Sequence, residues 1–247
     1  MTGMASSSSA ISTLAEFNAR LGTLQRAADS SGQPGRIPMG QIFQLAKDFA
    51  SASLEDIEAL LDSPSHPRRV AAVSVMDFQA RRQATPNGRR QELYELYLRR
   101  HDRIDTWDLV DRAAPHVVGG YLWDKSREPL YMLAGSPDWY ERRTSIVSTW
   151  FFIRRGDLDD TFRIGQILAN DPHDLVQKAV GGWIREAGKR DEQRLRDYLD
   201  RNAATMPRTA LRYAIEHLPP EVRDDYLGRK HDRAPRTWAE IRPPVTD

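Results

Sequence analysis

Cysteine is absent from this sequence of 247 residues, which excludes disulfide bonds, thiol catalysis and cysteine-ligated zinc or iron–sulfur sites. No apolar run approaches the ~20 residues needed to span a bilayer. Residues 1–10 have neither the basic region nor the apolar region of a secretory signal. We therefore expect a cytoplasmic protein without a membrane partner.

Lysine is scarce. The chain has five lysines and 31 arginines, and its net charge is only +1 because 36 basic residues face 35 acidic ones. A near-neutral balance argues against a nucleic-acid binder, which usually has a basic excess. The dominance of arginine argues the other way, since guanidinium groups suit phosphates and planar polar partners. Hydrophobic residues make up 40% and charged residues 29%, as in folded globular proteins.

Strand patterns are also nearly missing: alternating β-branched runs hardly occur between Met39 and Leu227. Ala, Leu, Arg, Glu and Gln dominate there, in segments of helical length, which predicts an all-α fold. We expect a leader with an amphipathic helix and a linker over residues 1–37, a helical domain over 38–228, and a basic tail over 229–247. The leader helix is predicted from apolar residues at helical spacing, namely Ile11, Leu14, Leu21, Leu24 and Ala28.

Several helix starts are predicted from capping residues. Ser53 precedes the helix of residues 54–62, and Ser136 and Asp171 each precede a proline that suits a first helical position. Asp105, with Asp108 three residues later, resembles a capping box.

Similar helices recur along the chain and align on positions 69, 107, 143, 178 and 212, with gaps of 38, 36, 35 and 34 residues. A period in the middle thirties with two helices per unit predicts an α-solenoid. The Trp, Leu-Gly and Tyr pattern of tetratricopeptide repeats is absent, so we expect HEAT-like repeats.

The aligned positions predict a concave basic face, because four of the five are Arg69, Arg143, Lys178 and Arg212. Four cations in a row suit the tracking of phosphates. The fifth is Trp107, and Asp111 lies one turn later on the same helix face. An aromatic ring and a carboxylate among cations form a site for a cationic substrate on an anionic polymer. The alternative is a solvated Asp and a core Trp.

A metal site is a further alternative. The chain contains the pairs His101-Asp102, His173-Asp174 and His231-Asp232. Such pairs ligate metals in one helical hydrolase family, but further ligands on neighbouring helices are needed. The pair after Asp171 lies at a helix start, where capping is the simpler role. We expect neither a metal nor another cofactor.

Four segments resemble the AlkD-type DNA alkylation repair family: residues 106–125, 136–157, 171–191 and 206–219, with residues 42–81 similar to its earlier part. The resemblance covers about residues 38–228. Members of that family are HEAT-like DNA glycosylases that remove positively charged N3- and N7-alkylated purines from duplex DNA, without a pocket for a flipped base. The resemblance therefore implies double-stranded DNA with alkylated bases as the partner, and we expect a monomer.

The resemblance also implies roles for single residues. The family's catalytic Asp lies four residues after a Trp, which gives Asp111 and Trp107 here. Its DNA-contacting Arg corresponds to Arg143. Lys178 is a weaker candidate for holding a phosphate.

One position departs from the family pattern. A second active-site Trp normally follows the first Gly of the K-A-V-G-W segment, but here Gly182 stands at that position and Trp183 comes one residue later. One residue rotates a side chain by about 100° around a helix. Either Trp183 still faces DNA, or the site has lost one aromatic wall. The second case predicts a roomier site for a bulkier adduct, or a DNA-binding relative without activity. A protein-interaction scaffold, a common use of α-solenoids, is the remaining alternative.

Overall fold

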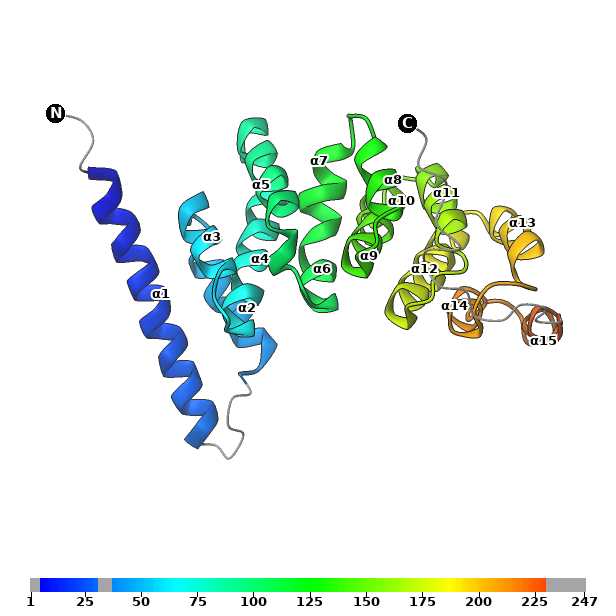
Figure 1. Ribbon diagram of the computed structural model, residues 1–247, viewed down its shortest axis with the longest axis horizontal. Coiled ribbons are helices and arrows are strands. Elements are labelled where there is room, and N and C mark those ends of the chain that lie inside the picture. The colour runs from blue at the N-terminus through cyan, green and yellow to red at the C-terminus, as the bar shows by residue number, and fades with distance from the viewer. Residues whose placement is uncertain (1–4, 31–36, 230–247) are drawn as a thin grey trace. The chain divides into compact units, whose positions relative to one another are not determined.

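The computed structural model describes residues 5–30 and 37–229, with side chains from residue 14 onward; these residues form helices and contain no β-strand (Figure 1). This confirms the prediction of an all-α helical repeat solenoid. Its HEAT-like class and the concave basic face stay predictions. Residues 31–36 of the expected linker and residues 230–247 of the expected tail lie outside the described residues. Within the described residues, no helix has the length and apolar character needed to cross a membrane.

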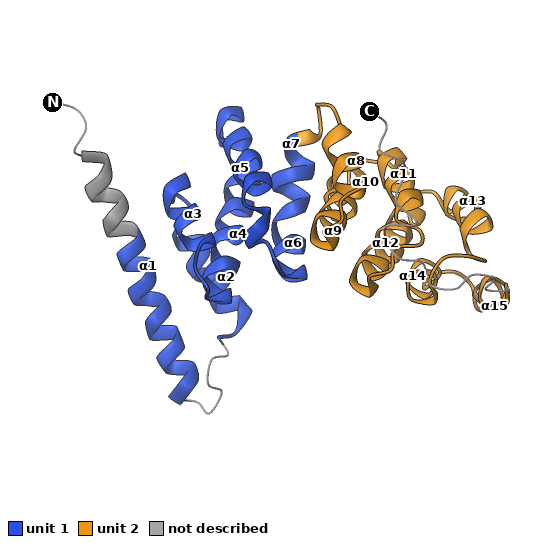
Figure 2. Cartoon of the chain, in the orientation of Figure 1, with its two compact units in different colours: residues 1–121 blue, residues 122–247 orange. Residues whose placement is uncertain are grey.

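The chain divides into two compact units, residues 1–121 and residues 122–247 (Figure 2). The helices of the first unit are α1 (Ala5–Ser30), α2 (Met39–Asp48), α3 (Leu54–Leu61), α4 (His66–Arg81), α5 (Asn87–Arg99), the 3₁₀ turn η1 (His101–Arg103), α6 (Trp107–Ala114) and the π-helical turn η2 (Pro115–Gly119). The short α7 (Gly120–Leu122) spans the boundary. The helices of the second unit are α8 (Glu128–Ala134), α9 (Trp139–Ser148), α10 (Trp150–Ile153), α11 (Asp159–Ile167), α12 (Asp174–Gly188), α13 (Glu192–Asn202), α14 (Arg208–Ala214) and α15 (Pro220–Gly228).

In the first unit the helices pack in two rows. α4 packs against α2 on one side and α6 on the other, while α3 and α5 pack against each other and against α4. The contact surfaces are apolar: Val70 and Val73 of α4 and Leu109 and Val110 of α6 are fully buried. The first two aligned positions, Arg69 and Trp107, therefore fall on neighbouring helices of one row.

The second unit repeats this arrangement. α12 packs against α9 and α14, and α11 and α13 also pack against α12. The aligned positions Arg143, Lys178 and Arg212 lie on α9, α12 and α14. Within each unit, the aligned positions thus lie on helices that are direct neighbours in space.

The leader helix α1 extends beyond the predicted apolar spacing, from Ala5 to Ser30. Leu21 and Ala28 are buried, as their spacing predicts, and Phe17 is buried as well. The Phe17 ring meets the Phe49 ring edge-on at 5.4 Å between centroids. This aromatic pair attaches α1 to the end of α2.

Among the predicted caps, Ser53 is confirmed, because its hydroxyl accepts a hydrogen bond from the Asp56 amide at 3.1 Å. Ser136 and Asp171 are not N-caps. Their side chains accept from the amides two residues on, at 3.0 Å from Asp138 and 2.8 Å from His173. These turns delay the start of α9 and α12, whose N-caps are Asp138 and His173.

The close crossing of α12 and α14 depends on a glycine. A Cβ atom at Gly181 would lie 2.6 Å from the Cβ of Tyr213 and well inside the van der Waals contact distance of the Ala210 carbonyl oxygen. The next residue of the same helix, Gly182, has open space at its Cβ position. Two adjacent glycines thus have opposite packing environments.

We expect Gly181→Ala to destabilise the protein by about 1–3 kcal/mol, because the added methyl group forces the two helices apart. Gly182→Ala is the matched control and is expected to stabilise by up to ~1 kcal/mol, since Ala has the better helix propensity and meets no obstacle. Urea unfolding followed by circular dichroism measures both. Equal effects of the two substitutions would contradict the close crossing.

Candidate functional site

The helix α6 has one buried face and one open face. Leu109, Val110 and Ala113 are fully buried against α4. Trp107, the first residue of the helix, is 50% exposed, and Asp111 one turn later is partly exposed. Residues four apart lie on one side of a helix, so the indole and the carboxylate are neighbours on the open face.

The beginning of α6 is held by two ion pairs from α4. His66 Nε2 lies 3.0 Å from Asp108 Oδ2, and Arg69 Nη2 lies 3.2 Å from Asp105 Oδ1. The predicted capping box is therefore wrong. The N-cap is Thr106, without a side-chain capping bond, and both carboxylates contact His66 and Arg69 of the neighbouring helix instead.

Beneath α6 lies a buried carboxylate that the sequence analysis missed. Asp77 on α4 is 1% exposed, and its oxygens lie 3.1 Å from Arg112 Nη1 and 2.8 Å from His116 Nδ1. The Arg112 guanidinium also lies over the rings of Phe43 and Phe78, at 4.7 and 4.8 Å. Burial in this site lowers the pKa of Arg112. The sequence does contain a signal for this site: Asp77 is a lone carboxylate in the apolar run of α4. A buried carboxylate needs a partner.

Two residues of the predicted basic face, Arg69 and Arg143, have side chains that are buried and bonded within their own units. Arg69 is 8% exposed and donates to the Ser63 carbonyl at 3.0 Å. Arg143 is 6% exposed and donates to the carbonyl of Leu175 at the start of α12. These arginines hold helices together, and their availability to a phosphate is lower than their sequence positions suggest.

Lys178 and Arg212 are more accessible. Lys178 Nζ pairs with Asp174 Oδ2 at 3.0 Å along the surface of α12. Arg212 is exposed on α14, and no ion pair of its guanidinium occurs within the described part of the chain. Of the four predicted cations, Arg212 is thus the one that a phosphate reaches most easily.

Trp183 and Gly182 differ in what surrounds them. The Trp183 indole is partly buried, and its Nε1 donates to the Val147 carbonyl of α9 at 3.1 Å. A side chain at position 182 would instead enter open space. The Trp183 indole is therefore bound to the neighbouring helix.

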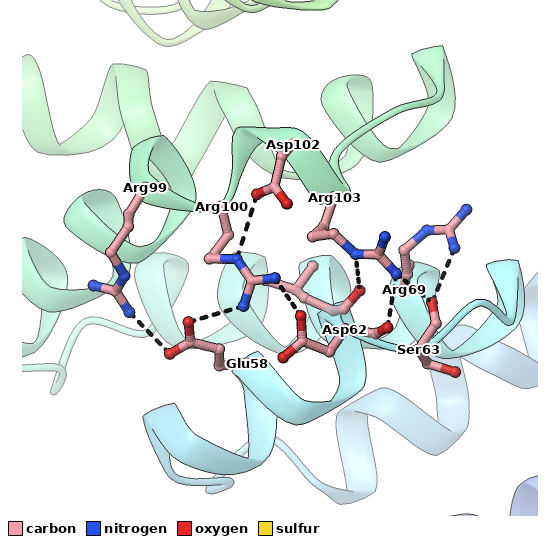
Figure 3. A network of polar contacts seen from close by, with 9 residues as sticks. Glu58, Asp62, Ser63, Arg69, Arg99, Arg100, Asp102 and Arg103 are labelled. Carbon is pink, nitrogen blue, oxygen red and sulfur yellow. Dashed lines mark hydrogen bonds and ion pairs between the residues drawn. The ribbon is translucent and has the colours of Figure 1, made fainter.

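Within the described residues, nine arginines donate to backbone carbonyls. In Figure 3, Arg103 donates to the Leu61 and Asp62 carbonyls at 3.2 and 2.7 Å, at the end of α3, and Arg100 pairs with Glu58 at 2.9 Å and with Asp62. Free carbonyls at a helix end need such donors. The arginines that bond backbone carbonyls are Arg69, Arg89, Arg90, Arg103, Arg127, Arg142, Arg143, Arg155 and Arg208.

The His-Asp pairs have structural partners where they are described. The His101 ring meets Tyr97 edge-on at 5.5 Å. His173 Nδ1 accepts from the Leu175 amide at 3.3 Å, and its ring stacks on Trp139 at 3.7 Å between centroids. The third pair, His231-Asp232, lies outside the described residues. The two described pairs thus contribute to packing and capping.

His173 makes stability depend on pH. Burial lowers the pKa of its imidazole below the ordinary value of about 6.5. Below that pH the unfolded chain takes up a proton that the folded chain resists, so stability is present above pH 6.5 and is lost as the pH falls toward the folded pKa. We expect the melting temperature of wild type to drop more between pH 7.5 and 5.5 than that of His173→Asn, which keeps a capping oxygen but does not titrate. Equal pH profiles would exclude this contribution.

A family of known proteins matches this chain. A search of curated proteins finds no match. The family model described as DNA alkylation repair enzyme matches residues 35–218, which include both aligned helices of the first unit and all three of the second. This match covers about three quarters of the chain, and it confirms the resemblance found in the repeated segments. The chain belongs to the family of DNA alkylation repair enzymes.

Proposed function

We propose that the protein is a DNA glycosylase that removes N3- and N7-alkylated purines from duplex DNA, acting as a monomer and without a cofactor. The observation that carries this proposal is the open face of α6, where Trp107 and Asp111 lie one turn apart. The buried face of α6 and the two ion pairs at its beginning fix the backbone that holds them. Preorganised groups of this kind favour stabilisation of a developing charge.

The chemistry needs few groups. Alkylation at N3 or N7 makes the purine positively charged, so the bond from C1′ to the base breaks with its electron pair moving to the base, which leaves neutral. The sugar becomes oxocarbenium-like, as in glycoside hydrolysis. The Asp111 carboxylate stabilises this cation and orients the water whose oxygen bonds to C1′, and the water's proton passes to Asp111 or to solvent. The Trp107 ring packs on the deoxyribose and adds a cation–π attraction.

Cations on the second unit hold the DNA backbone in this proposal. Arg212 offers an exposed guanidinium, and Lys178 needs only to exchange its surface pair with Asp174. Arg143 and Arg69 reach a phosphate only by giving up a carbonyl partner. We therefore expect Arg212 and Lys178 to contribute more to DNA affinity than Arg143 and Arg69. Each lost phosphate contact lowers the salt dependence of binding.

Release of 7-methylguanine and 3-methyladenine from methylated duplex DNA tests the proposal directly. The wild-type protein is expected to release these bases and leave abasic sites, and to leave unmodified duplex intact. Binding to DNA without release of either base would instead support a non-catalytic DNA-binding relative. Absence of both binding and release would support a protein-interaction scaffold.

Gly182 favours the second candidate function, a non-catalytic DNA-binding relative. The aromatic side chain that the family has at this position is missing. A Cβ atom added at Gly182 meets open space. We expect Gly182→Trp to increase release of methylated purines about five-fold or more, since stacking on one base contributes roughly 1–3 kcal/mol. Gly182→Ala, which adds a methyl group but no ring, is the matched control. Equal rates for the Trp and Ala variants would show that this position takes no part in base recognition.

A further inference from the structure

The second unit carries a surface on which aromatic rings and arginines alternate. It consists of Trp123, Trp150, Phe151, Arg154 and Arg155, and is called the aromatic–arginine patch below. Trp123 follows α7 and is 37% exposed. The other four residues belong to α10 and the turn that ends it, where Arg154 and Arg155 are exposed.

Two arginine–aromatic pairs each join a ring of α10 to an arginine four positions later. The Arg154 guanidinium carbon lies 5.3 Å from the centre of the Trp150 ring, and that of Arg155 lies 3.5 Å from the centre of the Phe151 ring. Both pairs have the four-residue spacing of neighbours on a helix. Arg155 also lies 5.5 Å from the Trp123 ring centre, so its guanidinium is bordered by two aromatic rings.

Trp123 is held in place by a second arginine. The Arg127 guanidinium lies 5.4 Å from the Trp123 ring and 3.8 Å from that of Phe152, and its Nη2 donates to the Trp123 carbonyl at 2.9 Å. Asp160 and Asp157 neutralise Arg127 at 2.5 and 3.2 Å. Contacts within the protein thus hold the Trp123 side chain in place. Its exposed indole is positioned before any ligand binds.

The charges of Arg154 and Arg155 are not neutralised in the same way. Neither guanidinium forms an ion pair within residues 14–30 and 37–229. Arg155 Nη1 donates to the Phe151 carbonyl at 3.2 Å. Partial burial, and to a lesser extent the charge of Arg154, lower the pKa of Arg155. The patch therefore presents flat apolar faces and two positive charges that remain for an anionic partner.

We propose that the aromatic–arginine patch binds single-stranded nucleic acid, with an unpaired base stacked against Trp123 and Arg155 and the adjoining phosphates held by Arg154 and Arg155. Flat rings alternating with anions are the chemistry of a single strand, whose bases stack on aromatic and guanidinium planes. An acidic peptide offers the anions without a flat ring at each step. This inference goes beyond base excision, because it requires no alkylated base and uses residues of the second unit alone.

Binding of the full-length protein to fluorescein-labelled oligothymidine of about twenty nucleotides, longer than the ~4–16 nucleotides that compact single-strand binders cover, tests the proposal. Fluorescence anisotropy gives the affinity, with an unmodified duplex of equal length for comparison. We expect Trp123→Ala and Arg155→Ala each to weaken binding to the single strand about five-fold or more, and binding to the duplex less. Unchanged affinity in the double variant would overturn the proposal.

Matched controls separate the patch from general charge. Arg190→Ala removes an exposed arginine and Tyr213→Ala an exposed ring of the same unit. Both are expected to change binding to the single strand less than two-fold or so, since neither belongs to the patch. If these controls lost as much affinity as the patch variants, binding to oligothymidine would depend only on overall charge, and the proposal would be contradicted.

Heparin, a polyanion without bases, separates stacking from charge. Arg155→Ala is expected to weaken heparin binding, whereas Trp123→Ala is expected to leave it unchanged. If Trp123→Ala weakened binding to heparin and to oligothymidine equally, base stacking would be rejected.

Arg155→Lys is the second test, for the case in which Trp123→Ala fails to fold. It keeps the charge but loses the planar group, so it should weaken binding to oligothymidine and leave binding to heparin unchanged. Asp111→Asn is expected to bind oligothymidine like wild type, so failure of the excision proposal leaves this one independently testable.

Discussion

Replacing Asp111 with asparagine is expected to reduce the release of methylated purines by about two to three orders of magnitude. Asparagine has nearly the same shape but carries no negative charge, so it cannot offset the positive charge that develops on the sugar. Asp111 lies on the open face of α6, away from the buried Leu109 and Val110, and folding should therefore change little. Single-turnover release from methylated duplex, with the protein in excess, measures the chemical step.

The control for this prediction is Asp102→Asn, which makes the same change of charge at an exposed residue of η1. It is expected to keep nearly the wild-type rate. DNA affinity should be similar in all three proteins or slightly higher in Asp111→Asn, because a negative charge facing the phosphates is removed. Retention of the full rate by Asp111→Asn would remove the carboxylate from the mechanism, and loss of binding would point to a structural role.

Asp171→Asn is expected to destabilise the second unit by about 3–5 kcal/mol, because it removes one partner of a buried ion pair. Asp171 is fully buried, and its two oxygens lie 2.6 and 3.2 Å from the Nε and Nη2 atoms of Arg142. Arg142 also donates to the carbonyls of Ser136 and Pro137 at 3.0 and 2.9 Å. The variant removes the Asp171 charge from beside a guanidinium that is only 2% exposed.

Asp174→Asn is the matched control, since it removes a carboxylate three residues later whose pair with Lys178 is exposed. Exposed pairs contribute only ~0–1 kcal/mol, so this variant should unfold at nearly the wild-type denaturant concentration. Urea unfolding monitored by circular dichroism compares the two. If Asp171→Asn were as stable as the control, the buried pair would contribute no net stability, which is the case for some buried ion pairs.

The repeated helices were predictable because their signals are local. Apolar residues at helical spacing predict the leader helix α1, and the hydroxyl of Ser53 predicts the start of α3. The period of the repeats places aligned residues on helices that are neighbours within each unit. A helical period, a cap and a repeat length all concern residues a few positions apart, or the same position in successive repeats.

The helix starts at α6, α9 and α12 were predicted less well, because partners far away in the sequence determine them. Asp105 and Asp108 have the spacing of a cap but bind Arg69 and His66 of α4 instead. Asp171 looks like a cap before a proline, yet its main partner is Arg142, 29 positions earlier in the chain. A carboxylate chooses between a backbone amide and a distant cation only when the helices have packed.

The sequence by itself determined the all-α repeat fold, the membership in a family of DNA alkylation repair enzymes, and the placement of Trp107 and Asp111 on one helix face. Only the tertiary structure decided what the 31 arginines do. It buries Arg69 and Arg143 against carbonyls, leaves Arg212 exposed, and orders Arg155 between two rings. The physical reason is that a guanidinium can pair with a carboxylate, donate to the carbonyls of a helix end or stack on an aromatic face, and packing decides which of them lies within its reach.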